Sequence, residues 1–151
     1  MKEYTINGKN LDLAVFSDII YNKVNVRICK ASKERIIRCR EIVGSIIEKN
    51  DVRYGINTGF GKFSNVMIDK KDTVELQKNI VLSHATGTGR PLDRSIVKGM
   101  MLLKLNSFLQ GFSGVRCIVA ETLNKMINSD IIPFVPEKGS VGASGDLAPL
   151  A

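Results

Sequence analysis

The sequence predicts a mainly α-helical fold with a small N-terminal α+β portion. In five stretches, apolar side chains recur every three or four residues, which is the period of a helix with one buried face. Near the N-terminus, Val24, Val26 and Ile28 instead alternate with polar residues, a pattern typical of a strand over 23–30. The chain has 151 residues, which suggests one domain.

Residues 4–13 form a short polar segment with a turn signal at Asn7-Gly8. Helices are expected over 11–21, 32–50, 72–84, 93–110 and 115–128. Ser32 is expected to cap the second helix, and Asp72 with Glu75 forms a capping-box arrangement at the third. The second helix should bury one face, made of Ile36, Cys39, Ile42, Val43, Ile46 and Ile47.

Glycine-rich segments interrupt the helices. Residues 51–69 contain Gly55, Gly59 and Gly61 and are expected to form a loop that needs unusual backbone angles. Gly87-Thr88-Gly89 should end the third helix. Residues 137–146 are expected to be an open loop, after which a helix should begin with Asp146 as its cap.

Composition excludes several classes of function. The net charge of +7 raises the alternative of a nucleic-acid partner, but the basic residues are scattered, which favours a solvated surface. No apolar run approaches the ~18 residues of a membrane span, and no signal peptide is evident, so a cytoplasmic protein without a membrane partner is expected. The three cysteines should be reduced and mostly buried, and the single histidine, His84, cannot build a histidine metal cluster.

The triplet Ala143-Ser144-Gly145 is suited to backbone cyclisation. The Gly145 amide nitrogen can attack the Ala143 carbonyl carbon because glycine has no Cβ to hinder the approach. The Ser144 hydroxyl can leave as water, and loss of a second water gives a conjugated five-membered ring, methylidene imidazolone (MIO). Gly142 lets the loop bend, and Asp146 is placed to assist proton transfer. A bare Ala-Ser-Gly would nearly always be an ordinary flexible loop.

Three ordered motifs resemble the histidine and phenylalanine ammonia-lyase family, over essentially the whole chain from the first strand onward. Residues 139–151 resemble its MIO signature, residues 54–61 its inner tyrosine loop, and residues 76–84 its substrate-selectivity helix. The resemblance implies the N-terminal part of the aspartase/fumarase-like helical-bundle lyase fold, with residues 1–151 ending just after the MIO-forming loop. Its central bundle and C-terminal parts would lie outside these residues.

The resemblance also implies the roles of the site residues. Tyr54 becomes a catalytic acid or base, although a loop tyrosine would otherwise be read as packing with its hydroxyl in water. A phenol has an ordinary pKa of about 10, so a base at neutral pH needs a lowered pKa. Asn57, Thr58 and Gly59 are expected to shape this loop. Ser83 and His84 become substrate-binding residues, whereas His84 alone would be read as a histidine near a helix C-terminus.

The implied reaction is non-oxidative elimination of ammonia from L-histidine to trans-urocanate, with MIO formed autocatalytically and no external cofactor. The Ser83-His84 pair resembles the histidine-specific members, because phenylalanine-specific members carry Phe-Leu and tyrosine-specific members His-Leu. The family's sites combine residues from several subunits of a homotetramer, so these 151 residues are expected to be inactive alone. The alternatives are a phenylalanine or tyrosine ammonia-lyase or aminomutase, and a non-catalytic interaction module.

Overall fold

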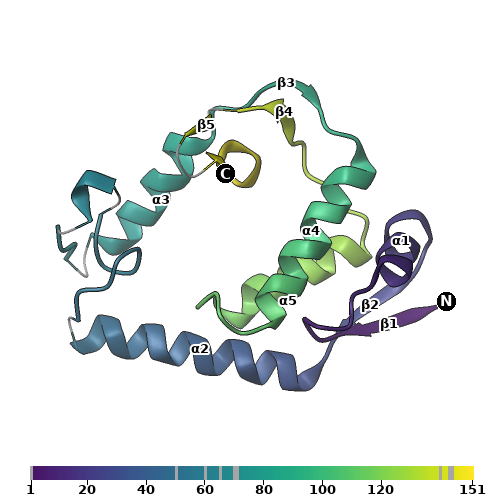
Figure 1. Ribbon diagram of the computed structural model, residues 1–151, viewed down its shortest axis with the longest axis horizontal. Coiled ribbons are helices and arrows are strands. Elements are labelled where there is room, and N and C mark those ends of the chain that lie inside the picture. Colours follow the sequence, from purple (N-terminus) through teal and green to yellow (C-terminus); the bar gives the residue numbers. More distant parts are fainter. Residues whose placement is uncertain are drawn as a thin grey trace. The chain divides into compact units, whose positions relative to one another are not determined.

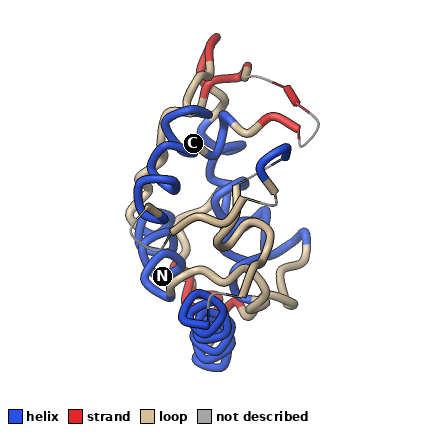
Figure 2. The backbone as a smooth tube through the Cα atoms, turned by 90° about the vertical axis from the view of Figure 1, so that its left-hand side faces the viewer, coloured by secondary structure: helices blue, strands red, loops and turns tan. Residues whose placement is uncertain are grey.

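Helices dominate the structure, a computed structural model that describes residues 2–49, 51–59, 61–64, 66–69, 72–139, 141–142 and 145–151 (Figures 1 and 2). The helices are α1 (Leu13–Tyr21), α2 (Lys30–Lys49), α3 (Thr73–His84), α4 (Arg94–Leu109) and α5 (Cys117–Asn128). The strands are β1 (Glu3–Ile6), β2 (Asn25–Ile28), β3 (Thr88–Pro91), β4 (Pro136–Lys138), β5 (Val141–Gly142) and β6 (Gly145–Asp146). Two 3₁₀ turns, η1 (Gly61–Phe63) and η2 (Ala148–Leu150), complete the elements. The mainly helical fold class is therefore confirmed.

The chain is organised as two compact units, each built from two separate stretches of sequence. Unit 1 comprises Met1–Ile42 and Asp93–Pro133, and unit 2 comprises Val43–Leu92 and Phe134–Ala151. Helix α2 begins in unit 1 and ends in unit 2. All the residues to which the sequence assigns a site role belong to unit 2.

Unit 1 opens with a parallel two-stranded sheet. Strand β1 pairs with β2 so that Glu3 lies opposite Asn25 and Ile6 lies opposite Ile28. Parallel neighbours require a crossover connection, and α1 supplies it. The sequence predicted β2 but not β1. Both strands have four residues, but β1 opens a segment that is polar overall, and its pairing with β2 stabilises it.

Helices α4 and α5 supply most of the unit 1 core. The buried residues of α4 fall at helical spacing along one face: Val97, Met101, Leu102, Leu105, Phe108 and Leu109. Strand residues Ile6 and Val26 and α5 residues Ala120 and Ile127 are also buried. Fully burying one such large apolar side chain contributes about 1.5–3 kcal/mol. The helices predicted over 93–110 and 115–128 are thus confirmed to within two residues at each end.

The predicted N-cap of α2 is wrong. The helix begins at Lys30, and the Cys29 carbonyl accepts hydrogen bonds from the backbone N–H groups of Ser32 and Lys33. Ser32 is fully buried inside the first turn, where its hydroxyl donates to the Asn7 carbonyl at 3.2 Å. The hydroxyl therefore serves a contact distant in sequence, which a local capping rule cannot anticipate.

The buried face predicted for α2 is also only partly present. Ile36 is buried, but Ile42 is 61% exposed, and Cys39, Val43, Ile46 and Ile47 are half-buried. Cys29, Cys39 and Cys117 are all free and half-buried, so the expectation of mostly buried thiols is too strong. Regular apolar spacing identified the helix correctly but overstated how much of it is covered.

A polar cluster joins β1 to α1. The Tyr4 hydroxyl donates to Asp18 Oδ2 at 2.6 Å, Lys2 Nζ lies 2.6 Å from the same oxygen, and Asn22 donates to Oδ1 at 2.7 Å. The hydrogen bond from Lys2, followed by those from Tyr4 and Asn22, lowers the pKa of Asp18 to about 2. The carboxylate therefore stays ionised, and keeps these contacts, down to strongly acidic pH.

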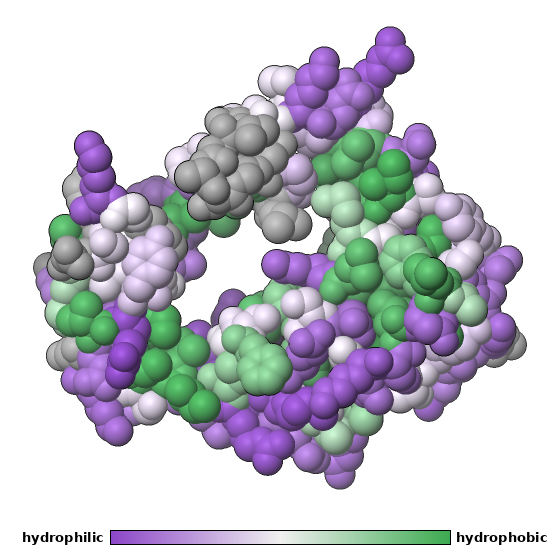
Figure 3. All heavy atoms as spheres, viewed as in Figure 1, coloured by the Kyte–Doolittle hydropathy of each residue, from purple (hydrophilic) through white to green (hydrophobic). Residues whose placement is uncertain are grey.

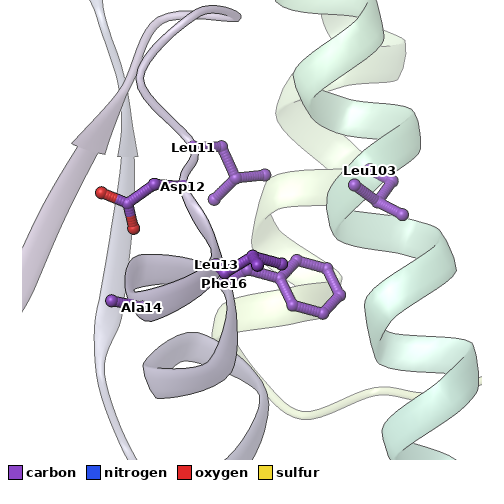
Figure 4. Close-up of a pocket in the computed structure, with 6 residues that line it drawn as sticks. All are labelled: Leu11, Asp12, Leu13, Ala14, Phe16 and Leu103. Carbon is purple, nitrogen blue, oxygen red and sulfur yellow. The ribbon is translucent and has the colours of Figure 1, made fainter.

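Unit 1 also carries an apolar groove of about 720 Å³ between α1 and α4. Leu11, Leu13, Phe16 and Leu103 line it and point toward one another in Figure 4. Figure 3 shows hydrophobic side chains gathered over this face, and Leu13 and Leu103 are both exposed. The groove contains no predicted site residue and only one charged side chain, Asp12.

Candidate functional site

Tyr54 stands on a turn at the start of the loop that precedes α3. Its side chain is 65% exposed. The turn closes through hydrogen bonds from the backbone N–H groups of Ile56 and Asn57 to the Arg53 carbonyl, at 3.1 and 3.3 Å. Gly55 has φ of +76°, a left-handed angle that side chains rarely adopt, so the glycine is needed immediately after the tyrosine.

The loop has a polar interior, which agrees with the prediction that Asn57 and Thr58 shape it. Asn57 is 4% and Thr58 is 1% exposed, and the side chains of both bond to the loop's own backbone. The loop also pairs with the segment that follows η1, because Thr58 forms an antiparallel bridge with Met67. The loop is therefore a folded structure and not an open connection.

Ser83 and His84 form the last two residues of α3. The helix ends as predicted, but Ala85 and not a left-handed glycine stands at its C-cap. The helix also begins as predicted after Asp72, although the Asp72 side chain makes no capping hydrogen bond. The pair therefore lies at the carbonyl end of the helix, where the backbone carbonyl groups lack helical partners.

The hydrogen bonds of His84 fix its tautomer. Nδ1 lies 2.8 Å from the Ile80 carbonyl oxygen and 3.0 Å from the Ser83 hydroxyl, which itself donates to the Ile80 carbonyl at 2.9 Å. A carbonyl oxygen can only accept, so Nδ1 must carry the hydrogen. In the neutral ring, Nε2 is then the acceptor. The half-buried ring thus offers an acceptor nitrogen to a ligand.

A short antiparallel ladder joins the two halves of unit 2. Strand β3, which starts four residues after His84, pairs with β4, with Thr88 opposite Lys138. A Cβ on Gly87 would overlap the Pro136 ring, and one on Gly89, where φ is +93°, would come within 2.9 Å of Glu137. The predicted role of these glycines, to end the helix, is wrong: they permit the close approach of β4.

The segment around the Ala-Ser-Gly triplet is a hairpin and not the predicted open loop. Strand β5 pairs with β6 in antiparallel register, with Val141 opposite Asp146 and Gly142 opposite Gly145. The chain therefore reverses direction between Gly142 and Gly145. Ala143 and Ser144 lie outside the described residues.

The helix predicted to begin at Asp146 is absent from the described residues at this position. Asp146 belongs to β6, and the helical segment that follows is a single 3₁₀ turn, η2, preceded by Leu147. Proline does occupy the start of this turn, as predicted. Leu147, and not Asp146, occupies the N-cap position of this turn, so the predicted cap is wrong.

The fold gathers two of the three predicted site segments. The end of α3 and the β5–β6 hairpin both lead away from the same end of the β3–β4 ladder (Figure 1). The loop of Tyr54 instead leads into the first turn of α3. A helix of 12 residues spans roughly 18 Å, so Tyr54 and the Ser83-His84 pair belong to segments at opposite ends of α3.

The described parts of the chain support neither a metal site nor a membrane-spanning helix. No group of three or more histidine, cysteine or acidic side chains is arranged to hold a metal ion among the residues described. No described helix combines the length and the apolar character needed to cross a bilayer.

Known proteins that are similar to this chain indicate the family to which it belongs. The aromatic amino acid lyase family matches residues 11–151. A histidine ammonia-lyase from Caldanaerobacter subterraneus is 49% identical over all 151 residues. The chain spans about 30% of the length of this relative.

Solved structures also match nearly the whole chain. Ergothionase from Treponema denticola, an ergothioneine-degrading enzyme, matches 99% of the chain with a TM-score of 0.91 and 26% identity. Histidine ammonia-lyase from Trypanosoma cruzi matches 99% with a TM-score of 0.84 and 30% identity. The chain covers 30% of the first of these proteins and 28% of the second. With a family match that covers nearly every residue, this chain belongs to the aromatic amino acid lyase family.

Proposed function

We propose that this chain supplies part of the active site of a histidine ammonia-lyase, which eliminates ammonia from L-histidine to give trans-urocanate. The observation that carries the proposal is the 49% identity with a histidine ammonia-lyase over the whole chain. The Ser83-His84 pair at the end of α3 supports histidine over an aromatic substrate without ring nitrogens.

The substrate's imidazole is bound by the end of α3. Nε2 of His84 accepts a hydrogen bond from the imidazole N–H, because Nδ1 is already a donor to the Ile80 carbonyl. The exposed Ser83 hydroxyl supports the orientation of the His84 ring through its contact with Nδ1. A phenylalanine side chain would leave Nε2 without this donor, and a polar group deprived of its partner disfavours the wrong substrate.

Tyr54 takes the proton that is lost from the substrate's β-carbon. Its exposed side chain, on a turn fixed by backbone hydrogen bonds, is accessible to a small molecule. The phenolic oxygen must be within hydrogen-bond reach of this proton when the substrate is bound. Because Tyr54 and His84 lie on segments at opposite ends of α3, we propose that other subunits complete each site. The proposed assembly is a homotetramer, as the family resemblance implies.

The hairpin fits the MIO group. The pairing of Gly142 with Gly145 brings the residues on either side of Ala143-Ser144 close together, which supports the proposal. Glycine at 145 leaves its amide nitrogen unhindered. Ala143, Ser144 and Gly145 would supply the atoms of the MIO ring, which would provide an electrophile for the substrate's amino group and so would help ammonia to leave. Asp146, which follows directly in β6, assists the proton transfers of ring closure.

The proposal includes a cytoplasmic protein with no external cofactor, no metal and no nucleic-acid or membrane partner. The scattered basic residues support a solvated surface. Weak, salt-insensitive retention on DNA and RNA would agree with this, whereas salt-sensitive binding would favour the nucleic-acid alternative.

The test is a substrate panel on a full-length lyase that carries these 151 residues. L-histidine, L-phenylalanine and L-tyrosine are compared by the absorbance of their unsaturated products. We expect turnover of L-histidine only. The double variant Ser83→Phe/His84→Leu should lower kcat/KM for L-histidine by ~100-fold or more, because the imidazole N–H then loses its acceptor.

The matched control is Ser129→Phe, at an exposed serine after α5 in unit 1. It should leave kcat/KM for every substrate unchanged. Preferred turnover of phenylalanine or tyrosine by the unsubstituted protein would overturn the histidine assignment and favour an aromatic lyase or aminomutase. No turnover of any of the three, with correct folding and assembly, would favour the non-catalytic interaction module.

A further inference from the structure

The residues on either side of Tyr54 are held by two buried side chains. On the N-terminal side, Asn57 Oδ1 accepts the backbone N–H of Arg53 at 2.8 Å. Asn57 Nδ2 donates to the Asp51 carbonyl, also at 2.8 Å. The side chain of Asn57 therefore binds one backbone donor, the Arg53 N–H, and one backbone acceptor, the Asp51 carbonyl, of the segment that leads into Tyr54.

On the C-terminal side, Thr58 performs the equivalent task. Its hydroxyl accepts the backbone N–H of Gly55 at 3.3 Å and donates to the Gly59 carbonyl at 3.0 Å. The two backbone N–H groups that flank Tyr54 in the sequence are thus bound by neighbouring side chains, Asn57 and Thr58.

These two side chains are themselves anchored. The Asn57 carbonyl accepts the N–H of Ile68 at 2.9 Å, and Thr58 is bridged to Met67. Asn57 and Thr58 are almost completely buried, so water cannot replace the hydrogen bonds that they make. Tyr54 is therefore an exposed side chain on a main chain that is fixed from both sides.

We propose that Asn57 and Thr58 are positioning residues for the elimination reaction, acting through the main chain of Tyr54. The inference rests on the proposed role of Tyr54 as the base. A proton acceptor must be held within hydrogen-bond reach of its proton, and a displacement of about 1 Å can lower a rate by roughly 100-fold. The proposed role does not require that Asn57 or Thr58 contact the substrate, and both side chains are buried.

The test is a double-mutant cycle in a full-length lyase that carries this chain. Asn57→Ala, Tyr54→Phe and the double variant are compared by kcat and KM for L-histidine. We expect Asn57→Ala to lower kcat by about 10- to 100-fold while KM changes less than about threefold. In the Tyr54→Phe background, the same substitution should lower kcat no further, because the group that it positions is already absent.

The cycle separates the two proposals. If Tyr54→Phe leaves kcat unchanged, the proposed role of Tyr54 fails, and the positioning role fails with it. If Tyr54→Phe abolishes turnover but Asn57→Ala leaves kcat unchanged, only the positioning role fails. Equal losses from Asn57→Ala in both backgrounds would show a general structural defect and would also overturn the inference.

Thr58 gives a second, independent measurement if the Asn57 variant does not fold. Thr58→Val keeps the shape of the side chain but leaves the Gly55 N–H without its acceptor, whereas Thr58→Ser keeps the hydroxyl. We expect kcat to fall with valine and to be restored with serine. Thr122→Val, at an exposed threonine of α5, is the matched control and should have no effect. Equal kcat values for the valine and serine variants would contradict the inference.

Discussion

At the scale of single residues, two glycines of this chain differ in whether their position requires glycine. Gly8 has φ of +90°, and a Cβ there would lie 2.9 Å from the backbone nitrogen of Gln110. Gly44 lies inside α2, and a Cβ there would meet no atom within 4 Å. The first position needs glycine for its backbone angle and for close packing, and the second does not.

We therefore expect the two alanine variants to change stability in opposite directions. Gly8→Ala should lower the free energy of unfolding by about 1–3 kcal/mol, because it combines a strained backbone with a backbone overlap. Gly44→Ala should raise it by about 0.5–1 kcal/mol, because alanine loses less conformational freedom in a helix. Urea unfolding of both variants measures the difference. A stable Gly8→Ala protein would show that the turn at Asn7-Gly8 can rearrange.

Some roles of single residues could be predicted from the sequence, and others could not. The roles of Asn57 and Thr58 in shaping the tyrosine loop were predicted, because glycines and small polar residues side by side indicate a structured turn. The role of Ser32 was not, because its hydroxyl bonds to Asn7, 25 residues away in sequence. The tautomer of His84 also required coordinates, since it depends on the distance between Nδ1 and the Ile80 carbonyl.

At the scale of elements, strand β2 is covered on one edge by β1 and on the other by a side chain. Asn128, the last residue of α5, accepts the Val26 N–H at 2.8 Å and donates to the Val26 carbonyl at 2.9 Å. The amide thus makes the two hydrogen bonds that a neighbouring strand would make. Asn124, one turn earlier in α5, has a buried Oδ1 that finds no hydrogen-bond partner among the residues that the structure describes.

These two asparagines form a matched pair. Asn128→Ala should lower the free energy of unfolding by about 1–3 kcal/mol, because two backbone groups of β2 lose their partners. Asn124→Ala should change it by less than about 0.5 kcal/mol, because its Oδ1 makes no bond that could be lost. Thermal or urea unfolding of both variants, under identical conditions, gives the comparison. Similar losses for the two variants would mean that helix α5 is sensitive to any truncation and that the pairing with Val26 contributes little.

Elements differ in how much of them the sequence reveals. The bounds of α3 and α4 follow from apolar spacing and from the polar residues beside them, although the glycines expected to end α3 do not cap it. Strands β1, β3, β4, β5 and β6 were not predicted, because each is stabilised by its partner strand and not by an alternating pattern of its own. The pairing of β3 with β4 connects the end of α3 to the β5–β6 hairpin. The strands that were not predicted therefore hold these two segments of the candidate site together.

At the scale of the whole molecule, the distribution of site residues bears on activity. Ser83 and His84 share one end of α3 with the β5–β6 hairpin, while Tyr54 belongs to the loop before the opposite end of that helix. The two segments are joined to opposite ends of α3, a helix that spans roughly 18 Å. We therefore expect that residues beyond these 151 are needed to bring the proposed base and the proposed substrate-binding pair to one substrate.

We accordingly expect the purified 151-residue chain to produce no urocanate from L-histidine, whereas a full-length lyase that carries the same residues is active. The relatives that it matches are about three times as long, and their remaining length is available to complete the site. Absorbance of urocanate follows turnover, and the intact mass of the chain tests MIO separately, since ring formation removes two waters. Turnover by the isolated chain would show that Tyr54, His84 and the hairpin can meet without further residues, and the requirement for other subunits would then be wrong. An inactive chain that has lost two waters would instead show that the hairpin alone directs cyclisation, and that the missing contribution lies in substrate binding and proton transfer.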